Sequence, residues 1–235
     1  MNIVSIMAHQ DDEMRCLGTM LKCRARGDDL AFITLTDGSK GFVHDPEIAA
    51  DKAAAIRHRE MSALASKCGA KYSNLRFPDE FLYDTPEVRM CLIDAIRAAK
   101  PDVIFTHYDE DYNQDHVTTG LLVRHCAMQS ALPVLPTEHP PLRTVPAIFT
   151  VPPHGAFGFH PTHFVDVGDY EDQKIELLKL HESQEYALTT AVGAGFELLS
   201  RRSDAFWGEQ SGCEYAECFR PQGGRGTIKP FSVLP

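Results

Sequence analysis

The sequence predicts an α/β protein with a Rossmann-like, mainly parallel sheet and helices on both faces. Two patterns carry this prediction. Short apolar runs alternate with longer segments of helical periodicity, and a repeated strand-helix order produces parallel strands. Each early apolar run also ends in a polar cluster, and ligands bind beyond the carboxyl ends of such strands. We therefore expect the functional residues at one edge of the sheet.

The predicted strands are short apolar runs bounded by polar or turn residues. They cover residues 2–8, 30–36, 74–77, 102–107, 147–151, 162–167 and 215–219. The predicted helices have apolar residues at helical spacing, and several end at glycine or begin at proline. They cover residues 12–26, 49–68, 86–99, 116–130 and 170–188.

The segment 132–153 is the main irregular region of the chain. It contains seven prolines and predicts a loop or lid around the strand at 147–151. No internal repeat or low-complexity tract interrupts the sequence. The prediction is therefore a single domain over residues 1–235.

Composition excludes several classes of protein. The chain has 235 residues with 23 Lys and Arg against 33 Asp and Glu, a net charge of −10 that disfavours nucleic acid and anionic membranes. No apolar run is long enough for a membrane span, and the start of the chain does not resemble a signal peptide. Seven scattered cysteines are typical of a reducing compartment. We therefore expect a cytoplasmic protein.

Two polar segments after predicted parallel strands could converge on a metal ion. His9 and Asp12 are three residues apart across a strand-to-helix turn, and His116 follows another strand of the same sheet. Imidazole and carboxylate are ligands for zinc and related divalent ions. Three protein ligands leave a position for water, and Asp11 is placed to accept a proton. Each segment alone is more often a solvated turn, so the residues by themselves leave both interpretations open.

The segment AHQDDE at residues 8–13 resembles the AHPDDE signature of the LmbE/PIG-L-like zinc-dependent N-acetylglucosaminyl deacetylases. The resemblance continues in order over most of the chain. Its further motifs are Thr36-Asp37-Gly38, Arg57-x-x-Glu60, residues 101–107 with Asp115-His116, Phe164-Val165-Asp166-Val167, His181-Glu182-Ser183-Gln184 and Tyr215-Ala216-Glu217.

This resemblance implies a set of site residues and a cofactor. His9, Asp12 and His116 take the positions of the metal ligands, with Zn²⁺ or another divalent transition metal as the cofactor. Asp11 takes the position of the general base, and Asp115 that of an acid that orients an imidazole. A further residue, Arg57, is a candidate substrate contact, and the alternatives are a place on a solvated helix face or an ion pair with Glu60.

The chain departs from the family pattern at Gln10, where proline is usual, and at Asn113, where many members have a histidine. An asparagine amide donates a hydrogen bond but cannot transfer a proton. Asn113 is therefore expected to bind the oxyanion, unless another residue supplies the acid. His154, in a Pro-Pro-His-Gly segment, is the candidate for that acid and for a substrate contact.

The function implied is hydrolysis of an N-acyl group, usually acetyl, from an amino sugar or glycoconjugate. Two alternatives stay open: a metal-dependent hydratase or lyase acting on a small carboxylate, and a metal-bound ligand-binding protein without turnover. Asp11 argues against the last, because a pure binding site needs no base beside its water. The expected partner is a small-molecule or glycoconjugate substrate rather than nucleic acid or a membrane, and a homo-oligomer is one option for the assembly.

Overall fold

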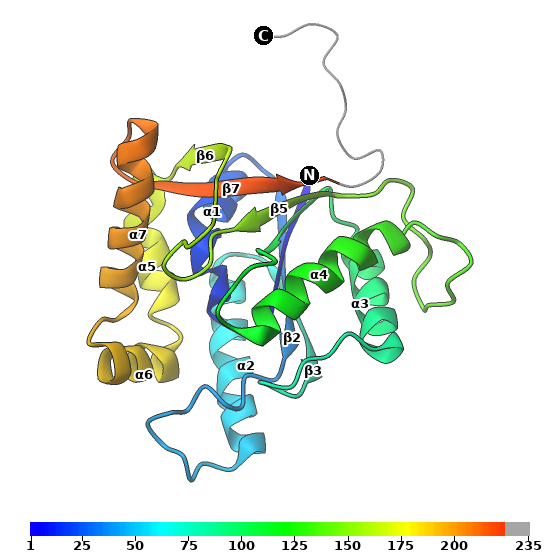
Figure 1. The fold of residues 1–235 in the computed structure, drawn as a ribbon, viewed down its shortest axis with the longest axis horizontal. Coiled ribbons are helices and arrows are strands. Elements are labelled where there is room, and N and C mark those ends of the chain that lie inside the picture. The colour runs from blue at the N-terminus through cyan, green and yellow to red at the C-terminus, as the bar shows by residue number, and fades with distance from the viewer. Residues whose placement is uncertain (224–235) are drawn as a thin grey trace, which may run out of the picture.

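A computed structural model describes residues 1–223 and shows a seven-stranded sheet covered by helices (Figure 1). The strand order is β3-β2-β1-β4-β5-β7-β6. The chain begins in the middle of the sheet, builds outward to β3, and returns to place β4 on the other side of β1. Open α/β sheets bind ligands where the strand order reverses in this way. The predicted α/β class is confirmed.

The sheet is parallel except at one strand. The parallel pairs join β1 (Asn2–Met7), β2 (Asp29–Thr36), β3 (Lys71–Phe77), β4 (Val103–His107) and β5 (Ala147–Val151). The last strand, β7 (Ala216–Gln222), runs antiparallel to β5 and to the edge strand β6 (His163–Asp166). Ile3 is paired with both Leu30 and Val103, so the central strands end at a similar level.

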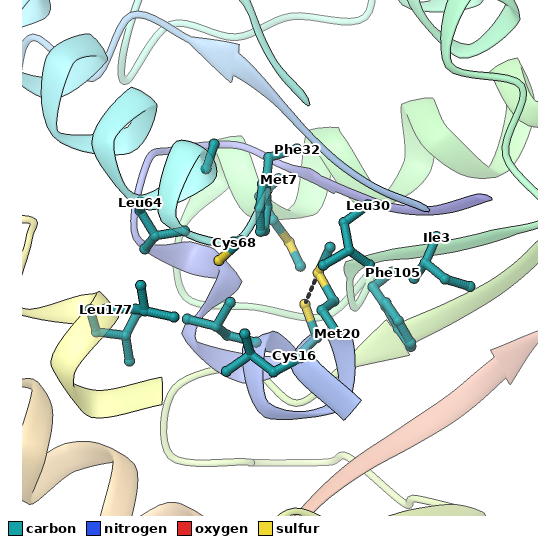
Figure 2. Packing of buried hydrophobic residues seen from close by; sticks show 14 of the residues in the cluster. Ile3, Met7, Cys16, Met20, Leu30, Phe32, Leu64, Cys68, Phe105 and Leu177 are labelled. Atoms are coloured by element: carbon teal, nitrogen blue, oxygen red, sulfur yellow. Dashed lines mark hydrogen bonds between the residues drawn. The ribbon is translucent and has the colours of Figure 1, made fainter. Parts of the chain in front are cut away.

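Helices cover both faces because the central strands are apolar on both sides. On one face, α1 (Leu17–Ala25), α2 (Ala50–Lys67) and α5 (Glu171–Leu178) contribute to a cluster with Ile3, Met7 and Phe32 (Figure 2). On the other, α3 (Pro86–Ala99) and α4 (Gln114–Gln129) pack with Val4 and Ile6. Among residues 1–223, no helix has the length and apolar character to cross a membrane.

The predicted helix over residues 170–188 is wrong as a single element. The structure divides this region into the 3₁₀ turn η2 (Gly168–Tyr170), α5 and α6 (Glu182–Val192). The break lies at His181, whose φ of −78° and ψ of 62° are not helical. The helix α7 (Phe196–Ser211) is absent from the sequence prediction. The first predicted helix also begins with a 3₁₀ turn, η1 (Asp12–Arg15), before α1.

Candidate active site

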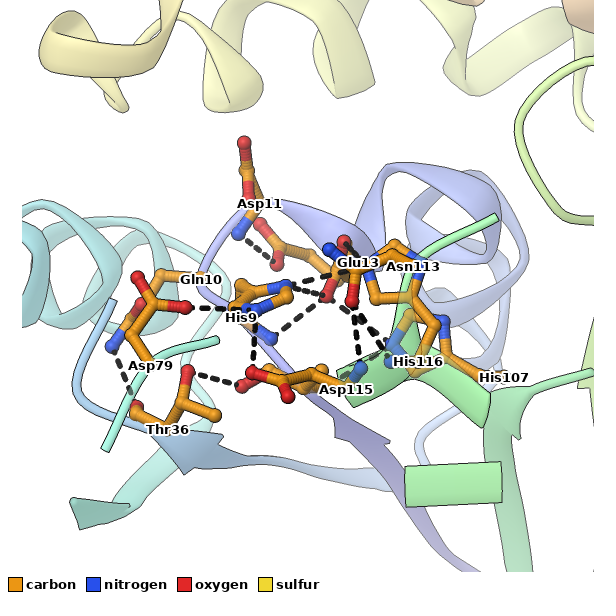
Figure 3. Close-up of polar contacts among 12 residues, drawn as sticks. His9, Gln10, Asp11, Glu13, Thr36, Asp79, His107, Asn113, Asp115 and His116 are labelled. Atoms are coloured by element: carbon orange, nitrogen blue, oxygen red, sulfur yellow. Dashed lines mark hydrogen bonds and ion pairs between the residues drawn. The ribbon is translucent and has the colours of Figure 1, made fainter. Parts of the chain in front are cut away.

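The polar segments that follow the parallel strands meet at one edge of the sheet (Figure 3). His9 follows β1, Asp79 follows β3, and His116 lies in the first turn of α4, which follows β4. Parallel strands point their carboxyl ends the same way, so these loops converge. His9 and His116 are thereby brought into contact although 107 residues separate them.

The atoms of three side chains converge on one point. Nδ1 of His9 lies 3.2 Å from Nε2 of His116 and 3.3 Å from Oδ2 of Asp12. Oδ1 of Asp12 lies 3.3 Å from Nε2 of His116. These are the three residues that the sequence predicts as metal ligands, and one ligand atom from each lies within 4.8 Å of the others.

Outer carboxylates hold the two imidazoles in the orientation that a cation needs. Nε2 of His9 lies 3.1 Å from Oδ1 of Asp79 and 3.5 Å from Oδ2 of Asp115, while Nδ1 of His116 lies 3.1 Å from Oδ2 of Asp111. A carboxylate on one ring nitrogen keeps the proton there and leaves a lone pair on the other. When both rings are neutral, as in a metal complex, two lone pairs and a carboxylate face a single point, so this donor set fits a divalent transition metal.

The charges around the convergence point favour a cation. Burial opposes ionisation of Asp12, but the charge of His116 outweighs it and holds the pKa of Asp12 well below its usual range. Burial also opposes charge on His116, while Asp12 and Asp111 raise the pKa of His116 to about 9. His107 stacks on His116 with ring centroids 4.0 Å apart, and burial and the neighbouring imidazolium lower its pKa to about 4. His107 therefore stays neutral, and its Nε2 accepts a hydrogen bond from the backbone of Ala8.

Asp11 lies beside the convergence point in an unusual backbone conformation. Its φ of 106° lies in the region that favours glycine. Oε2 of Glu13 accepts a hydrogen bond from the Asp11 amide at 3.0 Å, and Nη2 of Arg57 lies 3.0 Å from Oδ1 of Asp11. Burial raises the pKa of Asp11, and the charge of Arg57 offsets part of this effect. Asp11 is thus a stronger base than a solvated aspartate, as a proton acceptor requires.

Glu13 turns away from the convergence point and forms a buried pair. Its Oε1 lies 2.8 Å from Nε2 of His181, and both side chains are at most 2% exposed. The same carboxylate binds the Asp11 amide through its other oxygen. The first residue of the His-Glu-Ser-Gln motif is thereby connected to the backbone of Asp11. This contact also accounts for the helix break at His181.

Arg57 is buried rather than placed on a solvated helix face. It is 2% exposed, and its Nη2 donates to the carbonyl of Gln10 as well as to Asp11. The alternative ion pair with Glu60 is absent, because both Glu60 oxygens accept hydrogen bonds from Ser183. Arg57 therefore braces the turn that carries Asp11, and it also lines the cavity in front of the site.

Asn113 is the N-cap of α4. Its Oδ1 accepts from the backbone amides of Asp115 at 2.7 Å and His116 at 3.3 Å. This cap fixes which way the side-chain amide points, and within residues 1–223 Nδ2 has no hydrogen-bond partner. Asn113 lines the same cavity as His9 and Asp12, so the amide is available as a donor at the site.

His154 lies at the edge of the site, in the segment after β5. Its Nδ1 is 3.2 Å from Nη2 of Arg15, and its ring packs edge-on against Tyr112. Partial burial and the charge of Arg15 lower the pKa of His154. A neutral imidazole suits a substrate contact better than a proton donor. Both roles of His154 stay predictions.

Comparison with known proteins identifies the family. The family model described as PIG-L, GlcNAc-PI de-N-acetylase, matches residues 4–127, which is more than half of the chain. The chain belongs to the PIG-L family. It is also 30% identical to a diacetylchitobiose deacetylase of Thermococcus kodakarensis, over 93% of this chain and 82% of the relative.

Solved structures of similar fold agree with the PIG-L assignment. An N,N'-diacetylchitobiose deacetylase from Pyrococcus horikoshii, complexed with an inhibitor, matches with a TM-score of 0.81 and 26% identity. The match covers 94% of this chain and 83% of that one. The 4-carboxy-2-hydroxymuconate hydratase GalB of Pseudomonas putida matches with a TM-score of 0.80, at 18% identity over 98% of this chain and all of that one. At that identity the hydratase shows a shared fold alone.

Several residues of this PIG-L site lie outside the sequence prediction. Asp79 is the main omission, although Pro78-Asp79-Glu80 follows β3 and thus meets the same criterion as the other strand-end clusters. Asp111 is also outside the set of predicted site residues, whereas its Oδ2 contacts Nδ1 of His116. The role of Glu13 depends on His181, 168 residues away, and local sequence carries no signal for that contact.

Proposed function

We propose that this chain is a metal-dependent N-deacetylase that releases acetate from an N-acetylated amino sugar. The observation that carries the proposal is the convergence of His9, Asp12 and His116 beside a partly buried Asp11 that pairs with Arg57. The diacetylchitobiose deacetylase at 30% identity supports the substrate class. The neutral and hydroxyl-rich nature of such a substrate also suits an acidic protein.

The metal would be held by Nδ1 of His9, a carboxylate oxygen of Asp12 and Nε2 of His116. Zinc is the first candidate, although a site with two histidines and one aspartate accepts several divalent ions. When bound, such an ion supplies a Lewis acid for the amide carbonyl and lets a water ionise near neutral pH. Asp79, Asp115 and Asp111 would keep both imidazoles in the ligating orientation.

Asp11 is the proposed proton carrier. It accepts a proton from the attacking water as the oxygen forms a bond to the amide carbon. The same proton then goes from Asp11 to the departing nitrogen as the C–N bond breaks, which leaves the amine and acetic acid, and the acid loses its proton to solvent to give acetate. Arg57 holds the carboxylate in place through Nη2, and Glu13 fixes the backbone beneath it.

Asn113 is the proposed donor to the developing oxyanion. Its Oδ1 is occupied in capping α4, so Nδ2 is left to face the cavity. A neutral donor of this kind stabilises negative charge on oxygen without moving a proton. With Asn113 in this position, Asp11 is the group that both removes and returns the proton.

The test is an amine-release assay on metal-depleted protein to which Zn²⁺ is returned. N-acetylglucosamine and N,N'-diacetylchitobiose are the first substrates, and the Asp12→Asn variant with Zn²⁺ is the matched control. We expect amine and acetate in equal amounts from the native chain, with little from the variant or the depleted protein. Equal release by the native chain and Asp12→Asn would contradict the proposed metal site.

The same assay separates this proposal from the alternatives. A hydratase or lyase would consume a small unsaturated carboxylate and release no amine. A ligand-binding protein would bind N-acetylated sugars without turnover. Binding without amine or acetate release, in a protein that contains stoichiometric metal, would therefore overturn the deacetylase assignment.

A further inference from the structure

Two cavities open from the proposed reaction centre in different directions. One has a volume of about 300 Å³ and the other about 210 Å³. They meet at shared residues, which include two members of the metal site and the proposed base. The shared residues are Asp11, Asp12, Tyr112, His116, Leu188 and Val192.

The larger cavity has a mixed lining that offers more polar groups to a sugar ring than the smaller cavity does. Among the residues that line it alone are Lys40, Arg57, Glu80 and Gln184. These side chains come from the loops after β2 and β3 and from α2 and α6. They offer both donors and acceptors, which are the groups that recognise hydroxyls.

The smaller cavity has a different wall. The side chains that line it alone include Met14, Val151, Pro152, Pro153 and Leu199, which come from η1, from β5 and the segment after it, and from α7. Val151 is 2% exposed, so the far wall is firmly packed. Burial of a hydrocarbon group against these apolar side chains is favourable, so such a group suits this cavity.

The polar groups of the smaller cavity are already engaged with the protein. Arg15 lies 3.2 Å from His154 and donates to Oγ of Ser203 at 2.9 Å. Nε2 of His107 accepts from the Ala8 amide. A sugar placed here would lose water from its hydroxyls and find few free partners, which carries a free-energy cost.

We propose that the smaller cavity binds the acyl chain, and that this chain hydrolyses N-acyl amino sugars with acyl groups longer than acetyl. The inference rests on the proposed deacylase function. If the amide carbon lies at the residues that both cavities share, the sugar can extend into one cavity and the acyl chain into the other. The more polar, larger cavity then takes the sugar, and the more apolar, smaller cavity takes the acyl chain.

The volume of the cavity argues for more than a methyl group. The cavity of about 210 Å³ includes the space at the shared residues, where the amide group itself lies, and at about 30 Å³ for each water-sized unit the whole corresponds to roughly seven such units. The methyl of an acetyl group occupies about one of them. A chain of four to six carbons fills the cavity better, and each added methylene that is buried should raise kcat/KM about fourfold.

The experiment is a series of glucosamine substrates that carry acetyl, butyryl, hexanoyl or decanoyl groups, assayed by amine release from the zinc-loaded protein. We expect kcat/KM to rise by at least tenfold from acetyl to hexanoyl and to fall again at decanoyl. A steady fall in kcat/KM from acetyl onward would overturn the acyl-chain assignment while leaving the proposed function intact. Absence of amine from every substrate would overturn both.

Two neighbouring leucines of α7 provide a matched pair of variants. Leu199 lines the smaller cavity, whereas Leu198 lies outside it and is 41% exposed. Leu199→Trp should lower the hexanoyl-to-acetyl ratio of kcat/KM at least tenfold, and Leu198→Trp should leave the ratio at the native value. Equal ratios in the two variants would contradict the assignment.

A binding measurement on the native protein covers the case in which Leu199→Trp fails to fold. The carboxylate product should compete with substrate in the same cavity, so hexanoate should inhibit more strongly than acetate by roughly tenfold or more. Equal inhibition by the two carboxylates would overturn the assignment.

Discussion

Two buried clusters of carboxylates in this molecule differ in where their positive charge comes from. In the first, Asp12 and the residues around it converge on an open cavity. In the second, Asp204 and Glu217 surround Lys174, which is fully buried between α5, α7 and β7. Nζ of Lys174 lies 2.8 Å from Oε1 of Glu217, and the same carboxylate accepts from the amides of Gly18 and Thr19 at the start of α1.

The difference is between a positive charge that belongs to the chain, the ammonium of Lys174, and one that a bound ion would supply. The lysine cluster is sealed, and its cation is part of the chain, so it can join three helices and a strand permanently. In the site cluster the convergent atoms are two imidazole nitrogens and a carboxylate, so the proposed cation would come from solution. The opening that would admit the substrate would also admit that ion. Each prediction below tests one side of this contrast.

The largest expected effect is loss of the metal from the site cluster. His116→Ala removes Nε2 from the convergence point, so metal content should fall from about one ion per chain to near zero and turnover should be lost. Asp111→Asn leaves the ligand but weakens its orientation, and should lower metal affinity by roughly 10–100-fold. Metal analysis after dialysis measures both variants. Full metal content in His116→Ala would disprove the ligand assignment, and His139→Ala, which removes a histidine paired with Asp94, is the control.

The next largest effect separates the proton carrier from the metal. Asp11→Asn should keep its metal, because Asp11 is not one of the three convergent residues. Its kcat should nevertheless fall by about 10²–10⁴, since an amide cannot accept the proton. Steady-state kinetics at matched zinc content provide the measurement. Native kcat in this variant would remove Asp11 from the mechanism.

A substitution in the lysine cluster should lower the stability of the protein rather than act directly on turnover. Lys174→Met leaves Asp204 and Glu217 buried without a partner, and we expect the free energy of unfolding to fall by about 3–5 kcal/mol. Lys179→Met is the matched control, because Lys179 forms an exposed pair with Glu197, and exposed pairs contribute little to stability. Urea denaturation compares the two. If both variants lose equal stability, the buried cluster has no special structural role.

The smallest effect concerns Glu171, a buried carboxylate near Lys174 that forms no ion pair with it. Glu171 is 1% exposed, and burial, opposed in part by Lys174, raises its pKa to about 8. An unfolded glutamate ionises near pH 4.3, so the native state loses stability as the pH rises from that value toward 8. Glu171→Gln does not ionise and should gain roughly 1–3 kcal/mol relative to the native chain between pH 5 and pH 8. Urea denaturation at pH 5 and pH 8 measures the stability of both proteins. If the stability difference between Glu171→Gln and the native chain is the same at the two pH values, Glu171 is already ionised in the folded state.

The sequence predicts the first half of the fold well for identifiable reasons. The helix α3 begins at Pro86 and ends at Ala99 as predicted, because Thr85 caps it and proline suits its first position. The strands β1, β2 and β4 are buried on both sides and appear as continuous apolar runs.

The second half is harder to predict because its signals are tertiary. The helical pattern continues through residue 181, but the contact between His181 and Glu13 breaks the helix there. In α7, the buried face carries the polar residues Ser200 and Asp204, which interrupt the apolar stripe that sequence reasoning looks for. Asp204 is buried because Lys174 meets it, and that partner is 30 residues away.

In the candidate site, too, some features can be predicted from the sequence and others depend on tertiary contacts. Convergence of His9, Asp12 and His116 follows from the parallel order of the strands that precede them. The carboxylate facing each ring nitrogen depends on the paths of the loops, so the sequence does not specify the contacts of Asp79 and Asp111.

The left-handed backbone at Asp11 has a consequence for how this protein can evolve. Glycine would occupy a φ of 106° with less strain, so the aspartate costs roughly 1–2 kcal/mol of stability there. Replacement by glycine would remove that strain, but it would also remove the carboxylate that pairs with the buried guanidinium of Arg57. Substitution at position 11 is thus constrained by stability as well as by the proposed chemistry.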